Sequence, residues 1–311
     1  MKKYAVIDFS RTSLSLLVAN EEISRLEIVF KTYRPILIGE LVNKKERLTE
    51  KGIDKIISEA LELIDSARSL EADEIYGIST TLLRNIQNSE EVMNAIKEKT
   101  GLSVTSLSGK EEAYAAWYAN ENYKVLKKAV LFDIGGTSTE ICDFAHPYES
   151  DMISLDFGTS TIRSAFVKDV YPTKAEEEEI KAFVKGILKE QVEKHELENA
   201  VLSGSNMNAL YKIYQDYYDV PQSHERLMQY KKLKKLIKVL MNDKKRNSLI
   251  IKNVPEKTHL IVPSAICLKV MLKYFNIGNI TVSSYGVKEG YLKLIKKGAV
   301  KAEPLTVAKR G

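Results

Sequence analysis

The chain has 311 residues, of which 44% are hydrophobic and 29% are charged, as in an ordinary globular protein with room for two domains. No apolar run reaches the roughly 18 residues of a transmembrane helix, and the start, MKKYAVIDFSRTS, lacks the long apolar segment of a signal peptide. We therefore expect a cytoplasmic protein. Zinc chemistry is not expected, because Cys142 and Cys267 lie in apolar stretches and no metal-ligand spacing links the histidines.

The first part of the chain alternates between strand and helix patterns. Short apolar runs predict strands at 4–8, 13–20, 26–32, 74–80 and 102–107. Helical periodicity predicts an amphipathic helix in TEKGIDKIISEALELIDSARSL, and two further helices in NSEEVMNAIKEKTG and SGKEEAYAAWYAN. Asn88 and Ser108 are the expected N-caps of these two helices, with Glu91 and Glu111 three residues later.

The same order of elements begins again near residue 128. We predict strands at 128–134, 137–144, 150–156, 199–203 and 279–283, and helices around 158–168, 173–195, 205–217, 224–242, 262–276 and 286–297. This alternation favours an α/β protein. The predicted domains are 1–124 and 125–311, although the last helix, about 286–300, can pack back on the first domain. The residues that follow it are expected to form a loose tail.

The net charge of +5 is unevenly distributed. The segment YKKLKKLIKVLMNDKKRN, at 230–247, is rich in lysine, and its apolar residues recur at helical spacing. Two interpretations stay open: a helix with a solvated lysine face, or a track for a long polyanion.

Two segments resemble each other within the chain. VIDFSRTSLSL, at 6–16, aligns with LFDIGGTSTEI, at 131–141, so that Asp8 matches Asp133 and Thr12 matches Thr137. Each segment opens one half of the chain, which indicates a duplicated domain.

The second segment carries the most specific chemistry. A strand ends at Asp133, turns through Gly135 and Gly136, and returns with Glu140. Glycine can adopt positive φ and allows a ligand to approach the backbone, and amide groups in such a turn bind phosphate oxygens. Two neighbouring carboxylates beside a phosphate suit Mg²⁺. An ordinary hairpin with a polar turn explains the same residues equally well.

Several segments together resemble the exopolyphosphatase and guanosine pentaphosphate phosphohydrolase family, in the superfamily of actin and the sugar kinases. LFDIGGTSTE resembles the second phosphate loop of that family, DIGGGSTE. STTLLRNIQN, TGLSVTSLSGKEEAYAAW and ITVSSYGVKEGYL resemble three further family motifs in the same order. The resemblance extends from residue 4 to about residue 293 and implies two ribonuclease H-like, actin-like domains with mixed sheets that face a central cleft.

The resemblance also implies a role for each matching residue. Glu112 would be the general base and Arg84 would neutralise charge on the transferred phosphoryl group, while Asp133 and Glu140 would hold Mg²⁺. Each has a structural alternative, since Glu112 suits the first turn of a helix and Arg84 could pair with a surface acid. Phosphate contacts are expected from Arg11, Thr12, Ser13, Gly135, Gly136, Thr137, Ser138, Gly204 and Ser205.

Other positions depart from the family pattern. In the first phosphate loop, DFSRTS, Ser10 replaces a glycine, and a positive φ there would strain it. Leu37, Ser284 and Lys288 replace an arginine, an aspartate and an arginine, and only Gly204 is left of a Gly-Gly-Thr element. These departures leave phosphate binding better supported than nucleotide binding.

The leading interpretation is a Mg²⁺-dependent exopolyphosphatase, with guanosine pentaphosphate as a second substrate and a monovalent cation such as K⁺ as an optional cofactor. A catalytically weak protein that binds polyphosphate or an alarmone is the alternative, and a sugar or acetate kinase is disfavoured by Glu112 and by the changed Gly-Gly-Thr element. No nucleic-acid or membrane partner is expected, and a homodimer is left open.

Overall fold

The structure is a computed structural model that describes residues 2–21, 26–36, 41–223, 225–242 and 244–307. The chain forms two compact units, one of residues Met1–Ala119 with Val287–Gly311 and the other of residues Asn120–Gly286. The units divide at 119/120, whereas the sequence predicts a boundary at 124/125, and the last helix groups with the first unit, an arrangement that the sequence analysis left open. None of the described helices combines the length and the apolar content needed to cross a bilayer.

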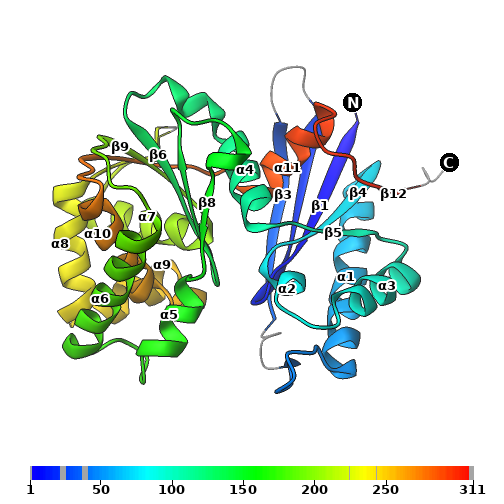
Figure 1. The fold of residues 1–311 in the computed structure, drawn as a ribbon, viewed down its shortest axis with the longest axis horizontal. Coiled ribbons are helices and arrows are strands. Elements are labelled where there is room, and N and C mark those ends of the chain that lie inside the picture. Colours follow the sequence, from blue (N-terminus) through cyan, green and yellow to red (C-terminus); the bar gives the residue numbers. More distant parts are fainter. Residues whose placement is uncertain (1, 22–25, 37–40, 224, 243, 308–311) are drawn as a thin grey trace. The chain divides into compact units, whose positions relative to one another are not determined.

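The first unit is a six-stranded mixed sheet with helices on both faces (Figure 1). The strands are β1 (Lys3–Phe9), β2 (Ser13–Glu21), β3 (Leu26–Pro35), β4 (Glu74–Ser79), β5 (Val104–Ser106) and β12 (Leu305–Thr306), in the order β12-β4-β1-β2-β3, with β5 also paired to β4. The helices are α1 (Glu50–Ser69), α2 (Thr81–Arg84), α3 (Ser89–Thr100), α4 (Gly109–Ala119) and α11 (Val287–Lys296).

The two faces of this sheet have separate cores, because successive side chains of a strand point to opposite faces. On β1, Ala5 and Ile7 pack with α1 and α3, whereas Tyr4 and Val6 pack with α4 and α11. Close packing of α11 on α4 explains Gly290, because a Cβ there would lie 1.7 Å from the carbonyl oxygen of Ala115.

The second unit has its own six-stranded mixed sheet, in the order β10-β11-β9-β6-β7-β8. Its strands are β6 (Ala129–Ile134), β7 (Thr139–Asp143), β8 (Ile153–Leu155), β9 (Asn199–Ser203), β10 (Leu227–Gln229) and β11 (Asn279–Val282). Its helices are α5 (Thr159–Phe166), α6 (Lys174–Gln191), α7 (Ser205–Tyr218), α8 (Tyr230–Asn242), α9 (Arg246–Asn253) and α10 (Ile261–Tyr274).

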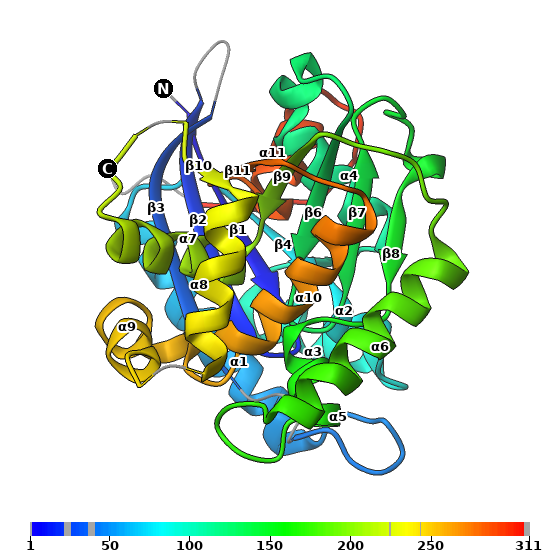
Figure 2. The ribbon, with the colours of Figure 1, turned by 90° about the vertical axis from the view of Figure 1, so that its left-hand side faces the viewer.

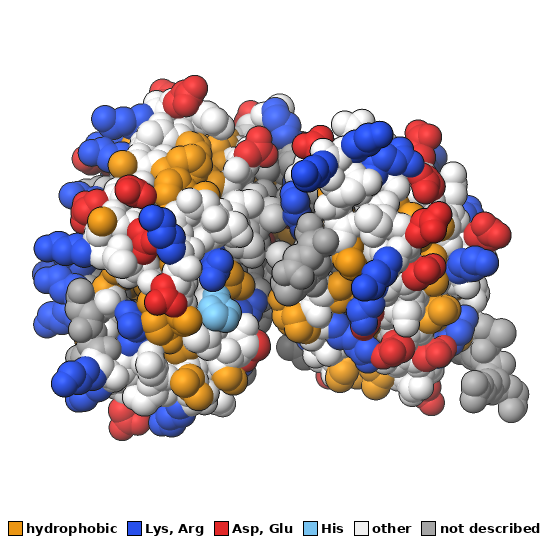
Figure 3. Space-filling model, turned by 90° about the horizontal axis from the view of Figure 1, so that it is seen from below, with side chains coloured by type: hydrophobic (Ala, Val, Ile, Leu, Met, Phe, Trp, Pro, Cys, Tyr) orange, Lys and Arg blue, Asp and Glu red, His pale blue; other side chains and the backbone are white. Residues whose placement is uncertain are grey.

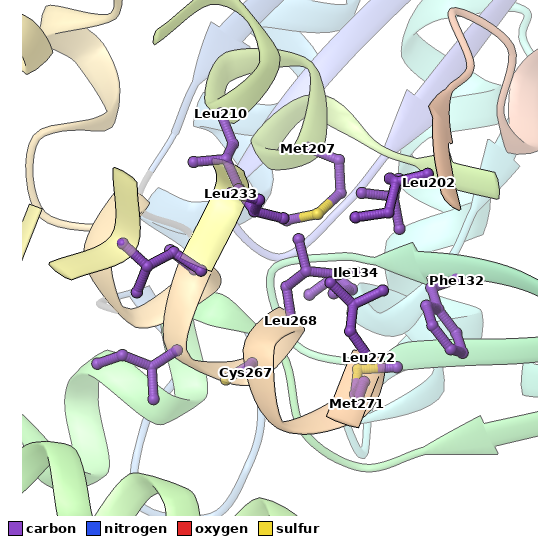
Figure 4. Close-up of a cluster of buried hydrophobic side chains, with 14 of the residues drawn as sticks. Phe132, Ile134, Leu202, Met207, Leu210, Leu233, Cys267, Leu268, Met271 and Leu272 are labelled. Carbon is purple, nitrogen blue, oxygen red and sulfur yellow. The ribbon is translucent and has the colours of Figure 1, made fainter. Parts of the chain in front are cut away.

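The large core of the second unit lies between this sheet and its helices. Figure 2 shows α6, α7, α8 and α10 in front of the strands. Phe132 and Ile134 of β6 and Leu202 of β9 meet Met207 of α7 and Leu268 of α10 in this core (Figure 4). Both cysteines are buried and unpaired, as expected for packing residues.

The two sheets repeat one connectivity. In each, the first strand of the unit is antiparallel to the second, the second is antiparallel to the third, and the first is parallel to the fourth. The first turns also share a hydrogen bond, from the amide of Ser10 to the carbonyl of Ser13 (2.9 Å) and from that of Gly135 to Ser138 (3.0 Å). The α/β fold prediction is confirmed, and the shared connectivity supports the predicted duplication.

Three local predictions are wrong. The helix expected at 224–242 begins only at Tyr230, because residues 227–229 pair with β11 as a strand. The expected loose tail includes β12, which pairs with β4, and Glu303 bonds Lys97 (2.9 Å) and Ser103 (2.7 Å). Asn88 occupies the predicted N-cap position of α3, but its side chain does not cap the helix, because it bonds the backbone amide and carbonyl of Leu48 (2.9 and 3.0 Å).

Candidate functional site

In the second unit, Asp133 and Glu140 stand directly opposite each other on β6 and β7. Residues paired in this way have Cβ atoms about 4.5–5.5 Å apart and point to the same face of the sheet. Both carboxylates are buried, with 6% and 1% of their surfaces exposed. The expectation that the returning strand brings Glu140 beside Asp133 is therefore confirmed.

Hydroxyl groups extend this row of polar side chains on both sides. Ser154 of β8 donates to Oε1 of Glu140 (3.0 Å), and Ser203 of β9 donates to Oδ2 of Asp133 (3.0 Å). The four residues lie on neighbouring strands and on the face opposite to the apolar core, since Phe132 and Ile134 flank Asp133 on the other face. Burial raises the pKa of the Cys142 thiol, and the negative charges of Glu140 and Asp133 raise it further.

The glycine turn between the two carboxylates is anchored to the start of α5. The carbonyl of Gly135 accepts hydrogen bonds from the amide of Thr159 (3.0 Å), and that of Gly136 from the amide of Ser160 (2.7 Å). This contact is so close that a Cβ on Gly158 would lie 2.4 Å from Gly136. Among the described residues, the amide of Gly136 meets no acceptor, so it remains available to a phosphate oxygen.

A second loop lies against Asp133. Gly204 has φ 95° and ψ 159° and begins α7, and a Cβ there would lie 2.7 Å from Oδ1 of Asp133. Gly204 therefore has positive φ, whereas Gly135 does not. Helix N-termini present unpaired amides and a partial positive charge, so the chemistry at the start of α7, at Ser205, suits an anion.

Lys257 is a residue that the sequence prediction missed. It is buried, and its ammonium donates to the hydroxyl of Ser205 (3.1 Å) at the start of α7. Burial lowers the pKa of Lys257, and the charge of Glu256 opposes that effect only in part. A single lysine among many carries no local signal, and the contact joins residues 52 positions apart.

The donor set of the second unit suits Mg²⁺. This ion usually takes one or two carboxylates and completes its octahedron with water and substrate phosphate. Asp133 and Glu140 supply the carboxylates, and two buried anions at this spacing are costly without a cation. Within the described ranges, no cluster of three or more histidine, cysteine or acidic side chains could hold a metal ion.

In the first unit, Arg84 and Glu112 are held together. Nη1 of Arg84 donates to Oε2 of Glu112 (3.0 Å) and to the carbonyl of Leu107 (2.8 Å). The Glu112 side chain is only 10% exposed. The capping box predicted for α4 is confirmed, because the Glu111 carboxylate accepts from the amide of Ser108 (2.7 Å) and the Ser108 hydroxyl accepts from the amide of Glu111 (3.2 Å). The cap places Glu112 in the first turn of α4.

The changed first phosphate loop forms a tight turn. The hydroxyl of Ser10 bonds the carbonyl of Ser13 (2.9 Å), and the two hydroxyls lie 2.9 Å apart. Ser10 does not have positive φ, so the strain considered for it is absent. Arg11 and Thr12 are partly exposed, and the Arg11 guanidinium forms no hydrogen bond or ion pair in the described part of the chain.

Asp8 and Lys288 are further polar residues near this turn. Burial raises the pKa of Asp8, while the charge of Lys288 and a hydrogen bond with Thr80 act in the opposite direction. Oδ1 of Asp8 is buried and has no hydrogen-bond partner among the described residues. Lys288 donates to the hydroxyl of Ser15 (2.9 Å). The internal repeat, which aligns Asp8 with Asp133, is the signal that could have identified Asp8.

Each unit gathers its candidate residues at one edge of its sheet. In the first unit, the segments that follow the parallel strands β1, β4 and β5 include residues 10–12, 80–84 and 107–112. In the second unit, the segments that follow β6 and β9 include residues 135–138 and 204–205. The carboxyl ends of parallel strands are the usual ligand-binding edge of such sheets. Leu37, the remaining departure from the family pattern, lies outside the described residues.

Comparison with known proteins finds relatives of this sequence. The model of the Ppx/GppA phosphatase family matches residues 17–296. A bifunctional 3-dehydroquinate synthase/phosphatase of Fusobacterium nucleatum is 27% identical over 307 residues, which cover 90% of this chain and 44% of that protein. Exopolyphosphatase 1 of Mycobacterium bovis is 24% identical over 177 residues, 55% of this chain and 50% of that protein. The chain thus spans about half the length of these relatives.

Solved structures share the fold. The Ppx/GppA family member of Aquifex aeolicus has a TM-score of 0.78 at 22% identity and covers 95% of this chain and 98% of its own. An exopolyphosphatase of Cytophaga hutchinsonii has a TM-score of 0.80 at 16% identity and covers 96% of this chain and 98% of its own. At these identities the likeness establishes the two-domain actin-like architecture alone.

Proposed function

Because the chain belongs to the Ppx/GppA phosphatase family, we propose that it is a Mg²⁺-dependent phosphoanhydride hydrolase that removes the terminal phosphate of inorganic polyphosphate. Guanosine pentaphosphate is the second proposed substrate. The observation that carries the proposal is the pair of buried carboxylates, Asp133 and Glu140, between a glycine turn and the N-terminus of α7. Phosphoryl transfer depends mainly on positioning and on the neutralisation of charge on the phosphate oxygens, which this arrangement supports.

The residues gathered in each unit would supply parts of this reaction. Asp133 and Glu140 would hold Mg²⁺, which would supply charge neutralisation on the transferred phosphate. The amide of Gly136 and the start of α7 would bind its oxygens, with Lys257 beside them as an additional positive charge. Arg84 would bind the transferred group, and Glu112 would orient and deprotonate the attacking water.

The ion pair between Arg84 and Glu112 supports a linked role for these two residues. A phosphate that binds Arg84 competes with the carboxylate for the same guanidinium, since both are anions that accept from its N–H groups. Substrate binding would therefore release the Glu112 carboxylate to accept a proton from water. The same ion pair also favours the second candidate, a phosphate-binding protein with little catalysis, if Arg84 does not exchange partners.

Phosphate release from long-chain polyphosphate and from guanosine pentaphosphate, with and without Mg²⁺, tests the proposal. Loss of a general base typically lowers the rate by about 10²–10⁴, so Glu112→Gln should lower kcat by that factor with substrate affinity kept. Glu98→Gln, an exposed change on α3 of the same unit, is the matched control. Substrate binding without Mg²⁺-dependent release by the wild type would favour the binding protein, and equal rates in both variants would remove Glu112 from the reaction.

A further inference from the structure

The outer face of α8 carries a row of exposed lysines that the proposed active site does not use. Lys231, Lys234, Lys235 and Lys238 follow one another at spacings of three, one and three residues, which places them on one side of the helix. We call these four residues the α8 lysine row. At a rise of 1.5 Å per residue, the row extends over about 10 Å.

The core of the second unit fixes which way this row faces. Leu233, Leu236 and Ile237 on the other side of α8 are fully buried in the large apolar cluster. At its C-terminal end, Arg246 donates to the carbonyl of Met241 (3.1 Å). Rotation of α8 would expose these apolar side chains, so the lysines are held toward solvent. Figure 3 shows lysine and arginine side chains gathered along the left-hand edge of this unit, the side on which α8 lies in Figure 1.

Little negative charge balances the row. The sequence of α8, YKKLKKLIKVLMN, has no acidic residue. Within the described residues, Lys231, Lys234 and Lys235 take part in no ion pair, whereas Lys252 of the neighbouring helix α9 pairs with Asp216.

The adjacent helix α10 has a lysine, Lys269, near this row. Burial lowers the pKa of Lys269, and the charges of Lys181 and Lys234 lower it further, although Glu177 acts in the opposite direction. Lys269 is itself paired with Glu177 (3.6 Å), so the charge that an anionic ligand would neutralise lies on α8.

The chemistry of the row favours a simple polyanion. The lysine ammonium is a point charge without the planar fork of arginine, so lysines recognise the negative charge of a ligand more than its geometry. A stacking platform for nucleic-acid bases needs aromatic or arginine side chains. The sequence of α8 has neither between Lys231 and Lys238. The apolar side of α8 is buried, so it has no face to insert into a membrane surface.

We propose that the α8 lysine row binds the distal part of a long inorganic polyphosphate chain whose terminal phosphate occupies the proposed active site. The inference rests on the proposed function, which uses only the last phosphates of such a chain. A second contact on the same polymer raises affinity through effective concentration, so long chains bind better than short ones. The row thereby selects for chain length.

Two variants with equal charge test this inference. The row variant combines Lys231→Gln, Lys234→Gln, Lys235→Gln and Lys238→Gln. The matched control combines Lys51→Gln, Lys99→Gln, Lys185→Gln and Lys189→Gln, which are exposed lysines on other helices. Binding of end-labelled long-chain polyphosphate is measured by fluorescence anisotropy in EDTA over a series of salt concentrations, with tripolyphosphate as the short ligand. Circular dichroism melts verify that both variants are folded.

The row variant should bind the long chain about tenfold or more weakly than the control. The slope of its log binding constant against log salt concentration should be less steep by about one for each lysine that contacts the chain. Tripolyphosphate should bind all three proteins equally. Equal long-chain binding by the two variants overturns the inference, and so does stronger competition by single-stranded RNA or anionic vesicles than by unlabelled polyphosphate at equal charge. This assay measures binding without Mg²⁺ and does not depend on hydrolysis. A protein that fails to hydrolyse polyphosphate would therefore count against the proposed function and not against this inference.

Discussion

Substitution of Gly204 by alanine should damage the second unit in two measurable ways. The backbone at Gly204, with φ 95° and ψ 159°, lies in a region that essentially only glycine adopts, so a side chain there costs about 1–3 kcal/mol. The new Cβ would also lie 2.7 Å from Oδ1 of Asp133 and 3.3 Å from the carbonyl of Ile134. The first distance is shorter than Cβ contacts allow, so the carboxylate must move away from its position opposite Glu140.

Urea and thermal unfolding give the first measurement. A loss of about 1–3 kcal/mol lowers Tm by about 2–4 °C per kcal/mol in a domain of this size. Gly186→Ala is the matched control in the same unit, because Gly186 lies within α6 and a Cβ there would meet nothing within 4 Å. That change should raise stability by up to about 1 kcal/mol, since alanine favours helix over glycine.

Magnesium dependence gives the second measurement. Displacement of the Asp133 carboxylate should raise the Mg²⁺ concentration required for half-maximal phosphate release by Gly204→Ala, whereas Gly186→Ala should keep the wild-type value. The reasoning is refuted if Gly204→Ala unfolds like the wild type and keeps its Mg²⁺ requirement, because both the backbone conformation and the approach to Asp133 would then be wrong.

Three further predictions follow from single sites. Asp133→Ala and Glu140→Ala should each raise the Mg²⁺ requirement, measured by phosphate release, and unchanged activity at low Mg²⁺ would make the pair structural. Burial lowers the pKa of Lys257 in the folded protein below its usual value of 10.5 in the unfolded chain, so the free energy of unfolding should rise with pH in the range between the two values. Lys257→Met should flatten that rise, measured by urea titrations at successive pH values. An identical slope in the variant would contradict the burial of the Lys257 charge. Arg11→Ala should raise KM more than it lowers kcat, as loss of ground-state binding does, while an unchanged KM would show that Arg11 does not contact phosphate.

Local sequence determined the features that depend on residues close together in the chain. The turn from Asp133 to Glu140 is short, so the pairing of their strands follows from the turn itself. The Ser108 cap of α4 and the buried face of α8 likewise depend on spacings of three and four residues. The aligned segments around Asp8 and Asp133 indicated two similar units before any contact between strands was known.

Tertiary structure decided the contacts between distant parts of the chain. Lys257 reaches Ser205 across 52 residues, Arg84 reaches Glu112 across 28, and Gly204 lies against Asp133 because β6 and β9 pair in parallel. The strand β10 forms from residues predicted to be helical because β11 offers an unpaired edge. Helical periodicity and capping reflect interactions between residues a few positions apart in the sequence. The contacts above depend instead on which distant surfaces the fold brings together. The sequence alone therefore identified the carboxylate pair, while the fold determined that Gly204 lies against Asp133 and that Lys257 contacts the start of α7.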